Sequence, residues 1–356
     1  MTSIPAGVVT GEDYINLVKA CKKGGYALPA VNVVDSTTAS AALEAAREAK
    51  SDIIIQVSNG GAHFFGGAGL DGSLENKIQG AKAFAQYMHT VAKSYGICVA
   101  LHTDHANRGL IPWLYGLIDE SKEFIKQTGK PLFSSHMLDL SEDDLEFNLS
   151  ESEKMLKEMA PLGMSLEIEL GCTGGEEDGI GSDIDTSADN AHLYTQPEDV
   201  LEAYDRLNSI GHFSIAASFG NVHGVYKPGN VKLRPEILKN SQTLATAERG
   251  LADNELDFVF HGGSGSEKSK IEEAVSYGCF KMNIDTDTQF ANSERVGKYV
   301  DENPVAFKHQ ICPETGTPQK KHYDPRKWMR AGQQGIVDRL GEAFKDLGSY
   351  GKSVAG

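Results

Sequence analysis

Histidine residues stand at three places where an apolar run of the sequence gives way to polar residues. His105 ends the run LHTDH, His223 lies in FGNVHG, and His261 begins HGGSGS after FVF. A neutral imidazole supplies the nitrogen ligand that zinc prefers, and three protein ligands leave a fourth position open for a substrate. A single histidine is more often a hydrogen-bonded core or surface residue. Three at the ends of apolar runs together predict a catalytic divalent-metal site.

Carboxylates accompany these histidines. Asp104 directly precedes His105, and strict alternation of side chains along a strand would place the two on opposite faces. Both can therefore serve one site only if the chain bends away at the end of this strand. His102 lies two residues before Asp104, and we interpret it as a structural residue that supports the site.

Two turns of glycine and small polar residues predict a site for an anion. HGGSGS runs from His261 to Ser266 before a predicted helix, and NIDT runs from Asn283 to Thr286 after the last predicted strand. Backbone N–H groups of such turns, with a helix N-terminus behind them, can bind a phosphate group. A glycine-rich turn alone is weak evidence, but beside a candidate metal ligand in a barrel it indicates a phosphate ester as substrate.

These residues need a scaffold that brings distant strand ends together. Eight apolar runs have the length of buried strands, and helical periodicity fills six of the segments between them. The predicted strands are 28–34, 52–58, 98–105, 132–139, 165–171, 213–219, 258–261 and 281–285, and the predicted helices are 37–49, 78–95, 111–128, 142–162, 197–208 and 267–277. This alternation predicts an α/β chain folded as one (β/α)8 TIM barrel domain over residues 1–356.

The alternative α/β fold is an open doubly wound sheet. It usually has a glycine-rich turn after its first strand, which VNVVDSTTAS lacks. Pro112, the pattern from Ser141 to Asp144, and Ser266 predict helix starts. Residues 172–196 and 292–325 exceed ordinary barrel connections, and we expect a long active-site loop and an extended C-terminal segment there.

The composition narrows the class of protein further. A formal net charge of −16 argues against nucleic acid or an anionic membrane as the main partner, because both would be repelled. The apolar runs are far shorter than the roughly 20 residues of a membrane helix, and MTSIPAGVVTGEDY lacks the pattern of a signal peptide. The five cysteines are scattered and form no CxxC pair, which is typical of reduced thiols in a cytoplasmic protein.

Eight long motifs extend over nearly the whole chain: LHTDH, PLFSSHMLDLSE, LEIELGCTGGEEDG, YTQPEDV, ASFGNVHGVYKPGN, FVFHGGSGS, KMNIDTDTQ and YDPRKW. Together they resemble class II, metal-dependent fructose-1,6-bisphosphate aldolase. The resemblance implies a glycolytic and gluconeogenic lyase that cleaves fructose 1,6-bisphosphate reversibly to dihydroxyacetone phosphate and glyceraldehyde 3-phosphate. It also implies that the reaction passes through an enediolate stabilised by zinc.

The resemblance also implies roles for individual residues. His105, His223 and His261 would hold the catalytic zinc, Asp104 would be the acid/base at the C4 oxygen, and Glu177 would be the mobile-loop base at carbon. Two carboxylates are needed because the two protons belong to different atoms of the substrate. Without the resemblance, the acidic run containing Glu177 would be interpreted as a solvated turn. Asn283 is placed to donate a hydrogen bond to the developing oxyanion.

A second, non-catalytic zinc position is implied at Asp139 and Glu169. The alternative for these two carboxylates is a buried polar network that supports the histidine ligands. A monovalent cation, K⁺ or Na⁺, is implied near Gly224 and Ser264.

The substrate phosphates are implied to bind at two ends of the site. Ser58 could otherwise cap a turn, and Arg326 could otherwise form a surface ion pair; the resemblance makes both phosphate ligands, with Arg326 contributed by the neighbouring subunit of a homodimer. The full set is Ser58, Gly224, Gly262, Gly263, Ser264, Asn283, Ile284, Asp285, Thr286 and Arg326. One departure from the family pattern is Ala-Asn-Arg-Gly at 106–109, where Cys-Ala-Lys-Lys is common, which puts in doubt a role of those lysines in subunit contacts or charge steering.

Four other functions remain open at this point. A tagatose-1,6-bisphosphate aldolase would differ only in stereochemistry. A Schiff-base aldolase needs a lysine on the catalytic face, whereas we expect Lys281 on the opposite face. Lys227 lies in a loop beside Pro228, with no evident desolvation to lower its pKa. A barrel metallohydrolase would want an HxH pair at the end of the first strand, where this chain has Asn32-Val-Val. A non-catalytic metal-binding protein would not explain the carboxylates and phosphate turns together.

Overall fold

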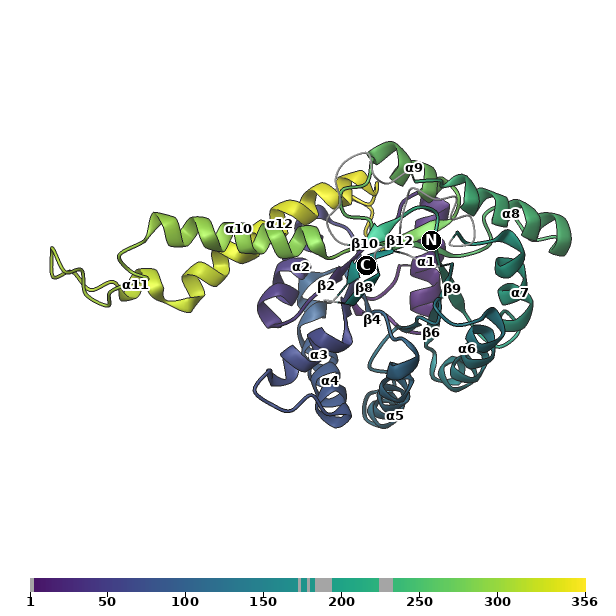
Figure 1. Cartoon of the computed structure of the whole chain (residues 1–356), viewed down its shortest axis with the longest axis horizontal. Helices are drawn as coiled ribbons and strands as arrows, with labels where there is room; N and C mark the ends of the chain where they lie inside the picture. The colour runs from purple at the N-terminus through teal and green to yellow at the C-terminus, as the bar shows by residue number, and fades with distance from the viewer. Residues whose placement is uncertain (1–2, 172–173, 178–179, 183–193, 224–232) are drawn as a thin grey trace.

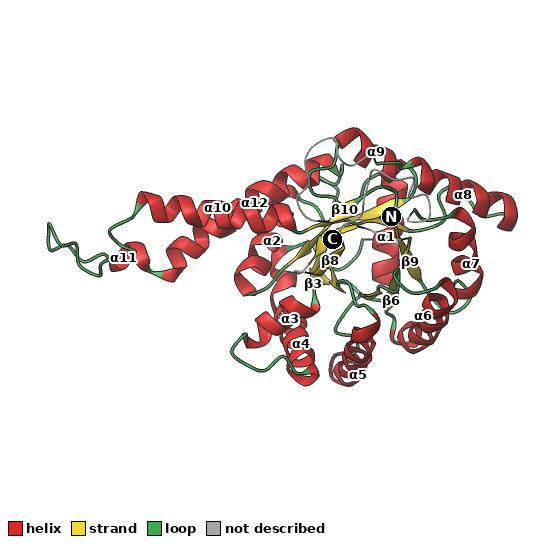
Figure 2. Ribbon diagram, in the orientation of Figure 1, coloured by secondary structure: helices red, strands yellow, loops and turns green. Residues whose placement is uncertain are grey.

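A computed structural model describes residues 3–171, 174–177, 180–182, 194–223 and 233–356. Of residues 174–177, 180–182 and 222–223 it describes the backbone alone. Long helices surround a central set of strands, and a pair of helices extends from one side (Figures 1 and 2).

Eight parallel strands close into a barrel. They are β2 (Leu28–Asn32), β3 (Ile53–Val57), β4 (Cys98–Thr103), β5 (Ser135–Leu138), β6 (Ser165–Leu170), β9 (Phe213–Ala217), β11 (Phe258–Phe260) and β12 (Cys279–Ile284). Each strand pairs with the next in this order, and β12 pairs with β2 to close the ring. The predicted (β/α)8 barrel is confirmed, and each predicted strand coincides with one of these. A short strand that we did not predict, β1 (Gly7–Val8), lies beside β4.

The described helices lie around the barrel, at its amino end and in an arm that extends from it. They are α1 (Glu12–Gly24), α2 (Ser36–Ala49), α3 (Asn59–Gly67), α4 (Leu74–Val91), α5 (Ile111–Thr128), α6 (Leu145–Met159), α7 (Pro197–Leu207), α8 (Glu236–Arg249), α9 (Lys268–Ser276), α10 (Thr286–Glu302), α11 (Lys320–Tyr323) and α12 (Pro325–Asp346), with 3-10 turns η1 (Ala92–Tyr95), η2 (Arg108–Leu110) and η3 (Ala160–Leu162). The six predicted helices are among them, whereas α1, α3, α8, α10, α11 and α12 were not predicted. None of the described helices combines the length and apolar composition that a membrane span requires.

The predicted helix starts are partly confirmed. Pro112 lies in the first turn of α5, where its missing N–H costs nothing. The Asp144 side chain caps α6 by accepting a hydrogen bond from the Phe147 N–H at 2.9 Å. Helix α9 starts one residue later than the sequence predicted from Ser266, because its N-cap is Glu267, and no side chain caps it.

Alternation along the strands divides the core into two layers. In β6, Leu166, Ile168 and Leu170 point outward and pack under the helices. The residues between them point into the barrel. The amino-terminal half of the barrel interior is apolar, where Tyr14, Leu17 and other side chains of α1 pack against inward residues of the strands. Polar side chains fill the carboxyl-terminal half of the interior. The barrel therefore has an apolar amino end and a polar carboxyl end.

A bulge in β12 changes which side chains enter the barrel. Phe258 pairs with Cys279 and Val259 pairs with Lys281, so Phe280 is an extra residue on β12. Phe280 packs in the barrel interior, and Lys281 also reaches inward to Glu167. The expectation that Lys281 lies on the opposite face is therefore wrong, because strict alternation does not hold across a bulge.

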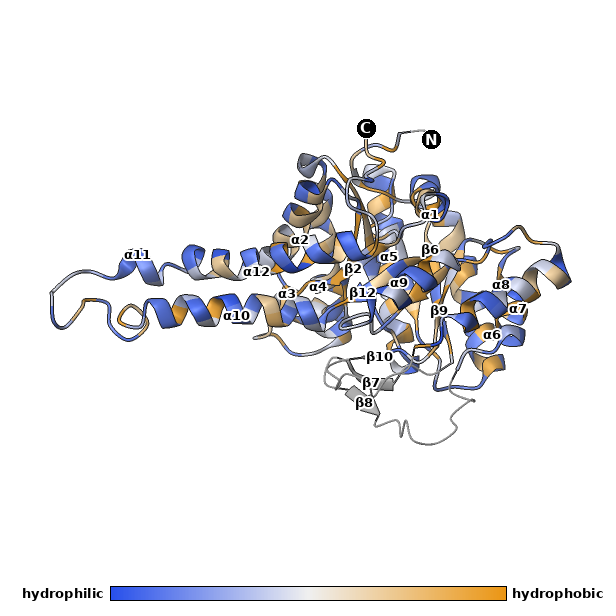
Figure 3. Cartoon of the chain, turned by 90° about the horizontal axis from the view of Figure 1, so that it is seen from above, coloured by the Kyte–Doolittle hydropathy of each residue, from blue (hydrophilic) through white to orange (hydrophobic). Residues whose placement is uncertain are grey.

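The extended C-terminal segment forms an arm. Helices α10 and α12 lie side by side and run out from the barrel in two perpendicular views (Figures 1 and 3). Gly335 of α12 permits this approach, because a Cβ there would lie 2.1 Å from the carbonyl oxygen of Ala291 on α10. The arm ends in residues 303–324, with α11 near its outer end.

Candidate active site

The chain leaves the barrel sheet immediately before Asp104. Strand β4 ends at Thr103, so the alternation that would separate Asp104 from His105 no longer applies. The Asp104 N–H still bonds to the Val57 carbonyl oxygen at 3.0 Å, which keeps the residue at the end of the barrel. Both side chains therefore face the same space, as the site requires.

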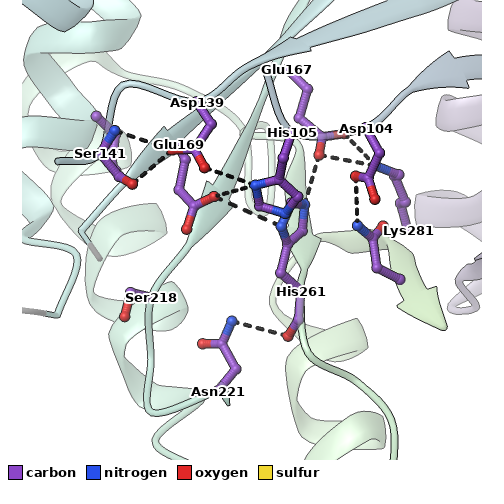
Figure 4. Close-up of polar contacts among 12 residues, drawn as sticks. Asp104, His105, Asp139, Ser141, Glu167, Glu169, Ser218, Asn221, His261 and Lys281 are labelled. Atoms are coloured by element: carbon purple, nitrogen blue, oxygen red, sulfur yellow. Dashed lines mark hydrogen bonds and ion pairs between the residues drawn. The ribbon is translucent and has the colours of Figure 1, made fainter. Parts of the chain in front are cut away.

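Asp104, His105 and His261 form a compact group at the polar end of the barrel (Figure 4). One potential ligand atom from each lies within 4.8 Å of the others. The two imidazole rings meet edge to face, with centroids 4.6 Å apart. Two imidazole nitrogens and a carboxylate oxygen are a donor set that suits zinc, so the residues present fit such an ion.

Each imidazole is oriented by a different carboxylate. His105 uses Nδ1 to bond Asp139 Oδ2 at 2.8 Å, whereas His261 uses Nε2 to bond Glu167 Oε1 at 2.8 Å. The nitrogen that can face a metal is therefore Nε2 in His105 and Nδ1 in His261. Carboxylates that bond the second nitrogen of a histidine ligand are usual around protein-bound zinc.

Asp139 and Glu169 lie beside His105. Ligand atoms of these three residues also lie within 4.8 Å of one another, and Glu169 Oε2 is 3.6 Å from His105 Nδ1. Asp139 accepts further hydrogen bonds from Ser141, at 3.1 Å from the backbone N–H and 2.7 Å from the hydroxyl. Burial would raise the pKa of Asp139, but the bond from His105 and those from Ser141 lower it overall. This arrangement is compatible with a second metal position and with a network that orients His105.

Two amide groups hold the Asp104 carboxylate. Asn32 donates to Oδ2 at 2.9 Å, and Asn283 donates to Oδ1 at 3.2 Å. Gln56 donates to the Asn32 oxygen at 2.6 Å, which orients that amide. Burial alone would raise the pKa of Asp104, but the positive charges that His105, Lys281 and His261 can carry lower it to about 2. The carboxylate is fixed in place and remains ionised at neutral pH.

Several residues of the site escaped the sequence analysis. Asn32, Gln56, Glu167 and Lys281 all reach into the polar end of the barrel. Alternation in SLEIEL places Glu167 on the same face as Glu169, and this signal could have found it. His102 bonds the Ser135 hydroxyl at 2.7 Å, in accord with its predicted supporting place.

The predicted phosphate turns lie at the carboxyl ends of β11 and β12. Gly262 has φ of +58°, and Gly263 approaches β12 so closely that a Cβ would lie 2.5 Å from Met282 Cγ. Ser264 follows in the same turn. The glycines are therefore required by the backbone path, whether or not an anion binds.

The second turn leads from β12 into α10. Asn283 and Ile284 end the strand, Asp285 is the N-cap, and Thr286 begins the helix. The backbone N–H groups of the first helical turn therefore lie directly after the strand that carries Asn283. Ser58 caps α3 by accepting a hydrogen bond from the Gly61 N–H at 3.0 Å. A capping role was the alternative to phosphate binding for this residue.

The backbone of the acidic loop approaches that of His223. Strand β7 (Gly174–Glu177) pairs in parallel with β10 (Val222–His223), and β8 (Ile180–Ser182) pairs with β7 in the antiparallel sense. His223 is opposite Gly175, two residues from Glu177. The side chains of Glu177 and His223, and the whole of Gly224, lie outside the part of the chain that the structure describes.

Arg326 lies apart from this group, in the first turn of α12. Its guanidinium bonds both oxygens of Asp324, at 3.1 and 2.7 Å, and its side chain is 88% exposed. The beginning of α12 belongs to the outer part of the arm (Figure 1). Within one chain, Arg326 is therefore not part of the site.

Comparison with known proteins gives matches over almost the full length. The sequence model of the family described as "Fructose-bisphosphate aldolase class-II" matches residues 12–352. A fructose-bisphosphate aldolase of Campylobacter jejuni is 51% identical over 354 residues, 98% of each chain. A "Fructose-bisphosphate aldolase class 2" of Escherichia coli K12 is 49% identical over 350 residues, 97% of this chain and 96% of that one.

A solved structure agrees with these sequence matches. The crystal structure of fructose-bisphosphate aldolase from Campylobacter jejuni superposes with a TM-score of 0.88 at 50% sequence identity. The alignment covers 98% of this chain and 97% of the other. The likeness therefore includes the barrel and the extended C-terminal region together.

Proposed function

The chain belongs to the class II fructose-bisphosphate aldolase family, and from this membership we propose that it catalyses the reversible aldol cleavage of fructose 1,6-bisphosphate. The products are dihydroxyacetone phosphate and glyceraldehyde 3-phosphate, as in glycolysis and gluconeogenesis. The observation that carries the proposal is the group of Asp104, His105 and His261, whose ligand atoms lie within 4.8 Å of one another. This group brings two metal ligands and a proton acceptor together in one place.

His105, His223 and His261 are the ligands that we propose for the catalytic zinc. The 4.6 Å distance between the rings of His105 and His261 supports two of them, and the family motif FGNVHG supports His223. When bound there, zinc supplies Lewis acidity that stabilises negative charge on the carbonyl and hydroxyl oxygens of the ketose phosphate.

Two carboxylates handle the protons of the reaction. In the cleavage direction Asp104 accepts the proton of the C4 hydroxyl as the C3–C4 bond breaks. Its lowered pKa keeps the carboxylate ionised and therefore available as the acceptor. Glu177 then supplies the proton to the carbon left behind. Asn283, whose amide donates to Asp104 at 3.2 Å, is the donor that we assign to the developing oxyanion.

The two phosphate groups bind at opposite ends of the substrate. Gly262, Gly263 and Ser264 offer backbone N–H groups after β11. Asn283, Ile284, Asp285 and Thr286 bring the start of α10 to the same end of the barrel, with Gly224 completing this phosphate site. Ser58 and a neighbouring subunit's arginine, equivalent to Arg326, hold the other phosphate. A monovalent cation, K⁺ or Na⁺, binds near Gly224 and Ser264.

A second zinc position is proposed at Asp139 and Glu169. Its support is their distance from His105, since ligand atoms of the three residues lie within 4.8 Å of one another. The same carboxylates orient His105 when no second ion is bound.

The assembly is proposed to be a homodimer of single-domain chains in the cytoplasm. The exposure of Arg326 and its position on the outer arm support a role in another chain's site. The family match over residues 12–352 supports a single domain, and the charge of −16 disfavours nucleic acid and membranes as partners.

The other candidate functions fit the site less well. Lys281 is enclosed and bonded to both oxygens of Glu167, so it is not a nucleophile for a Schiff base. Asn32 at the end of β2 serves Asp104 and does not belong to an HxH pair of a metallohydrolase. A tagatose-1,6-bisphosphate aldolase has the same chemistry, and substrate comparison separates the two.

The test is a pair of cleavage assays coupled to a reductase that consumes the triose phosphate. We expect kcat/KM to be at least about tenfold higher for fructose 1,6-bisphosphate than for tagatose 1,6-bisphosphate, the difference that about 1.4 kcal/mol of transition-state binding gives. Borohydride added during turnover should not inactivate the enzyme. A preference for tagatose, or covalent trapping of substrate, would overturn the assignment.

A further inference from the structure

Glu167 and Lys281 form an ion pair inside the barrel that no step of the proposed reaction uses. The Lys281 ammonium lies 2.9 Å from Oε1 and 2.7 Å from Oε2 of Glu167. The two side chains are 1% and 2% exposed. Glu167 comes from β6 and Lys281 from the bulged part of β12, so the pair joins two strands that are not neighbours in the barrel.

The same carboxylate also bonds His261, which is fully buried. His261 Nε2 lies 2.8 Å from Glu167 Oε1 (Figure 4). An ammonium group can only donate hydrogen bonds, and an ionised carboxylate can only accept them. Because Glu167 accepts from Lys281 at both oxygens, the bond to His261 must be donated by the imidazole Nε2–H.

We infer that Glu167 and Lys281 are positioning residues that fix His261 in the Nε2–H tautomer, so that Nδ1 faces the metal. His105 is arranged in the opposite way, since its Nδ1 bonds Asp139 and Nε2 is the nitrogen that would face the metal. The two histidines therefore present different nitrogens to the metal. Asp139 determines which nitrogen faces the metal in His105, and Glu167 determines it in His261. This inference rests on the proposed metal centre.

The ammonium of Lys281 ensures that Glu167 accepts, and His261 donates, in the hydrogen bond between them. A buried carboxylate without a partner is strongly destabilising, and the ammonium compensates it. The bulge at Phe280 is what turns Lys281 inward, so the backbone irregularity has a consequence for the metal ligand. His102, whose Nε2 is 3.6 Å from Glu167 Oε2, adds a weaker contact to the same carboxylate.

The substitution Glu167→Gln tests the inference. An amide keeps one accepting oxygen where the carboxylate has two, and Lys281 bonds both of these positions. In the variant Lys281 and His261 therefore compete for a single acceptor, and the tautomer of His261 with its proton on Nδ1 gains population. We expect zinc affinity, measured by competition with a chromophoric chelator, to fall about 10- to 100-fold. In zinc-free protein labelled with ¹⁵N-histidine, the His261 resonances should move from the Nε2–H pattern toward the Nδ1–H pattern.

A second substitution separates tautomer control from structural damage. In Glu167→Gln/Lys281→Met no ammonium competes for the amide oxygen, which can again accept from His261. Zinc affinity should then recover by at least about threefold over Glu167→Gln, although the double variant carries more changes. Asp257→Asn is the matched control, because it breaks the Lys22–Asp257 pair of 2.5 Å at the amino end of the strands. It should lower the unfolding temperature and leave zinc affinity unchanged.

Two results would overturn the inference: zinc affinity within twofold of the native chain in Glu167→Gln, or an unchanged Nε2–H pattern for His261. The variant His261→Gln tests the metal centre itself in the same assay. Tight zinc binding by His261→Gln would reject the centre. Weak binding by His261→Gln with native-like binding by Glu167→Gln would reject only the positioning role.

Discussion

At the scale of single residues, the polar end of the barrel contains several carboxylates that have different hydrogen-bond partners. Asp104 is held by the amides of Asn32 and Asn283, whereas Asp139 and Glu167 each orient one histidine. A carboxylate held by amide donors keeps its geometry and can still accept a proton. Asp104 is therefore the member of this set to which we assign the proton transfer at oxygen.

The substitution Asp104→Asn should lower kcat about 10²- to 10⁴-fold, the usual contribution of a positioned acid or base. The amide keeps the shape of the side chain but cannot take up the proton. The measurement is steady-state cleavage of fructose 1,6-bisphosphate, with zinc content determined on the same sample. Asp205→Asn, which breaks only an exposed pair with Arg249, is the control and should leave kcat unchanged. A kcat within twofold of the native value in Asp104→Asn would contradict the assignment.

The burial of His136 leads us to expect that the folded chain loses stability in acid. It is fully buried and bonds the Thr103 hydroxyl at 2.7 Å, and burial lowers its pKa to about 3. An unfolded histidine has a pKa near 6.5, so between about pH 6.5 and 3 the unfolded chain binds a proton that the folded chain does not. Stability contributed by the neutral ring is thus complete above about pH 6.5 and is lost as the pH falls.

Comparison with His136→Asn isolates this effect. Asparagine can keep the bond to Thr103 but does not titrate, so its stability should depend less on pH. Below about pH 6 the native chain should lose about 1.4 kcal/mol more per pH unit than the variant, in urea unfolding with a chelator present. Equal pH slopes for the two proteins would contradict the pKa assigned to His136.

At the scale of elements, the sequence predicts the strands better than the helices around them. The eight strands were found because each is a short apolar run, whereas α1 and α8 interleave charged residues with their apolar face. The faces within β4 and β6 also follow from alternation, which places Glu167 beside Glu169. The bulge in β12 was not predictable, because it is defined by the register with β11 and leaves no mark in CFKMNI.

The approach of α10 and α12 depends on the glycines of α12. In an open helix, Gly→Ala stabilises by about 0.5–1 kcal/mol, and Gly341 meets nothing within 4 Å, so Gly341→Ala should raise the unfolding temperature. At Gly335 a Cβ would lie 2.1 Å from the Ala291 carbonyl oxygen, so Gly335→Ala should cost about 1–3 kcal/mol. Thermal unfolding of the two variants should therefore shift in opposite directions. Stabilisation by both would contradict the close packing.

At the scale of the whole molecule, the barrel gathers a site from residues that the sequence places far apart. Asp104, Glu167, His261 and Asn283 come from four strands or strand ends, and the closed ring brings them together. The positions of His105, His261 and Asp104 at strand ends were predictable because polar residues end apolar runs. The network behind them was not, since it depends on which inward side chains meet across the barrel.

If Arg326 completes the site of the neighbouring chain, two impaired variants should restore activity when they form mixed dimers. Arg326→Ala should raise KM for fructose 1,6-bisphosphate about 10- to 100-fold, the loss expected for a charge-assisted bond to phosphate. Its side chain is 88% exposed, so folding should be unaffected. Mixing this variant with Asp104→Asn and allowing subunit exchange should restore a fraction of activity with the native KM, because one hybrid site has both groups. Absence of this fraction in proven hybrids would contradict a shared site.

The most direct test of the account is a zinc titration of the metal-stripped enzyme. The protein is freed of metal with a chelator, and cleavage of fructose 1,6-bisphosphate is measured as zinc is added per chain. We predict that the stripped enzyme is inactive, that activity rises in proportion to zinc, and that it reaches its maximum at about one equivalent, as expected for three histidine ligands and one open position. Full activity in protein shown by metal analysis to hold less than about a tenth of an equivalent of any divalent metal would contradict it.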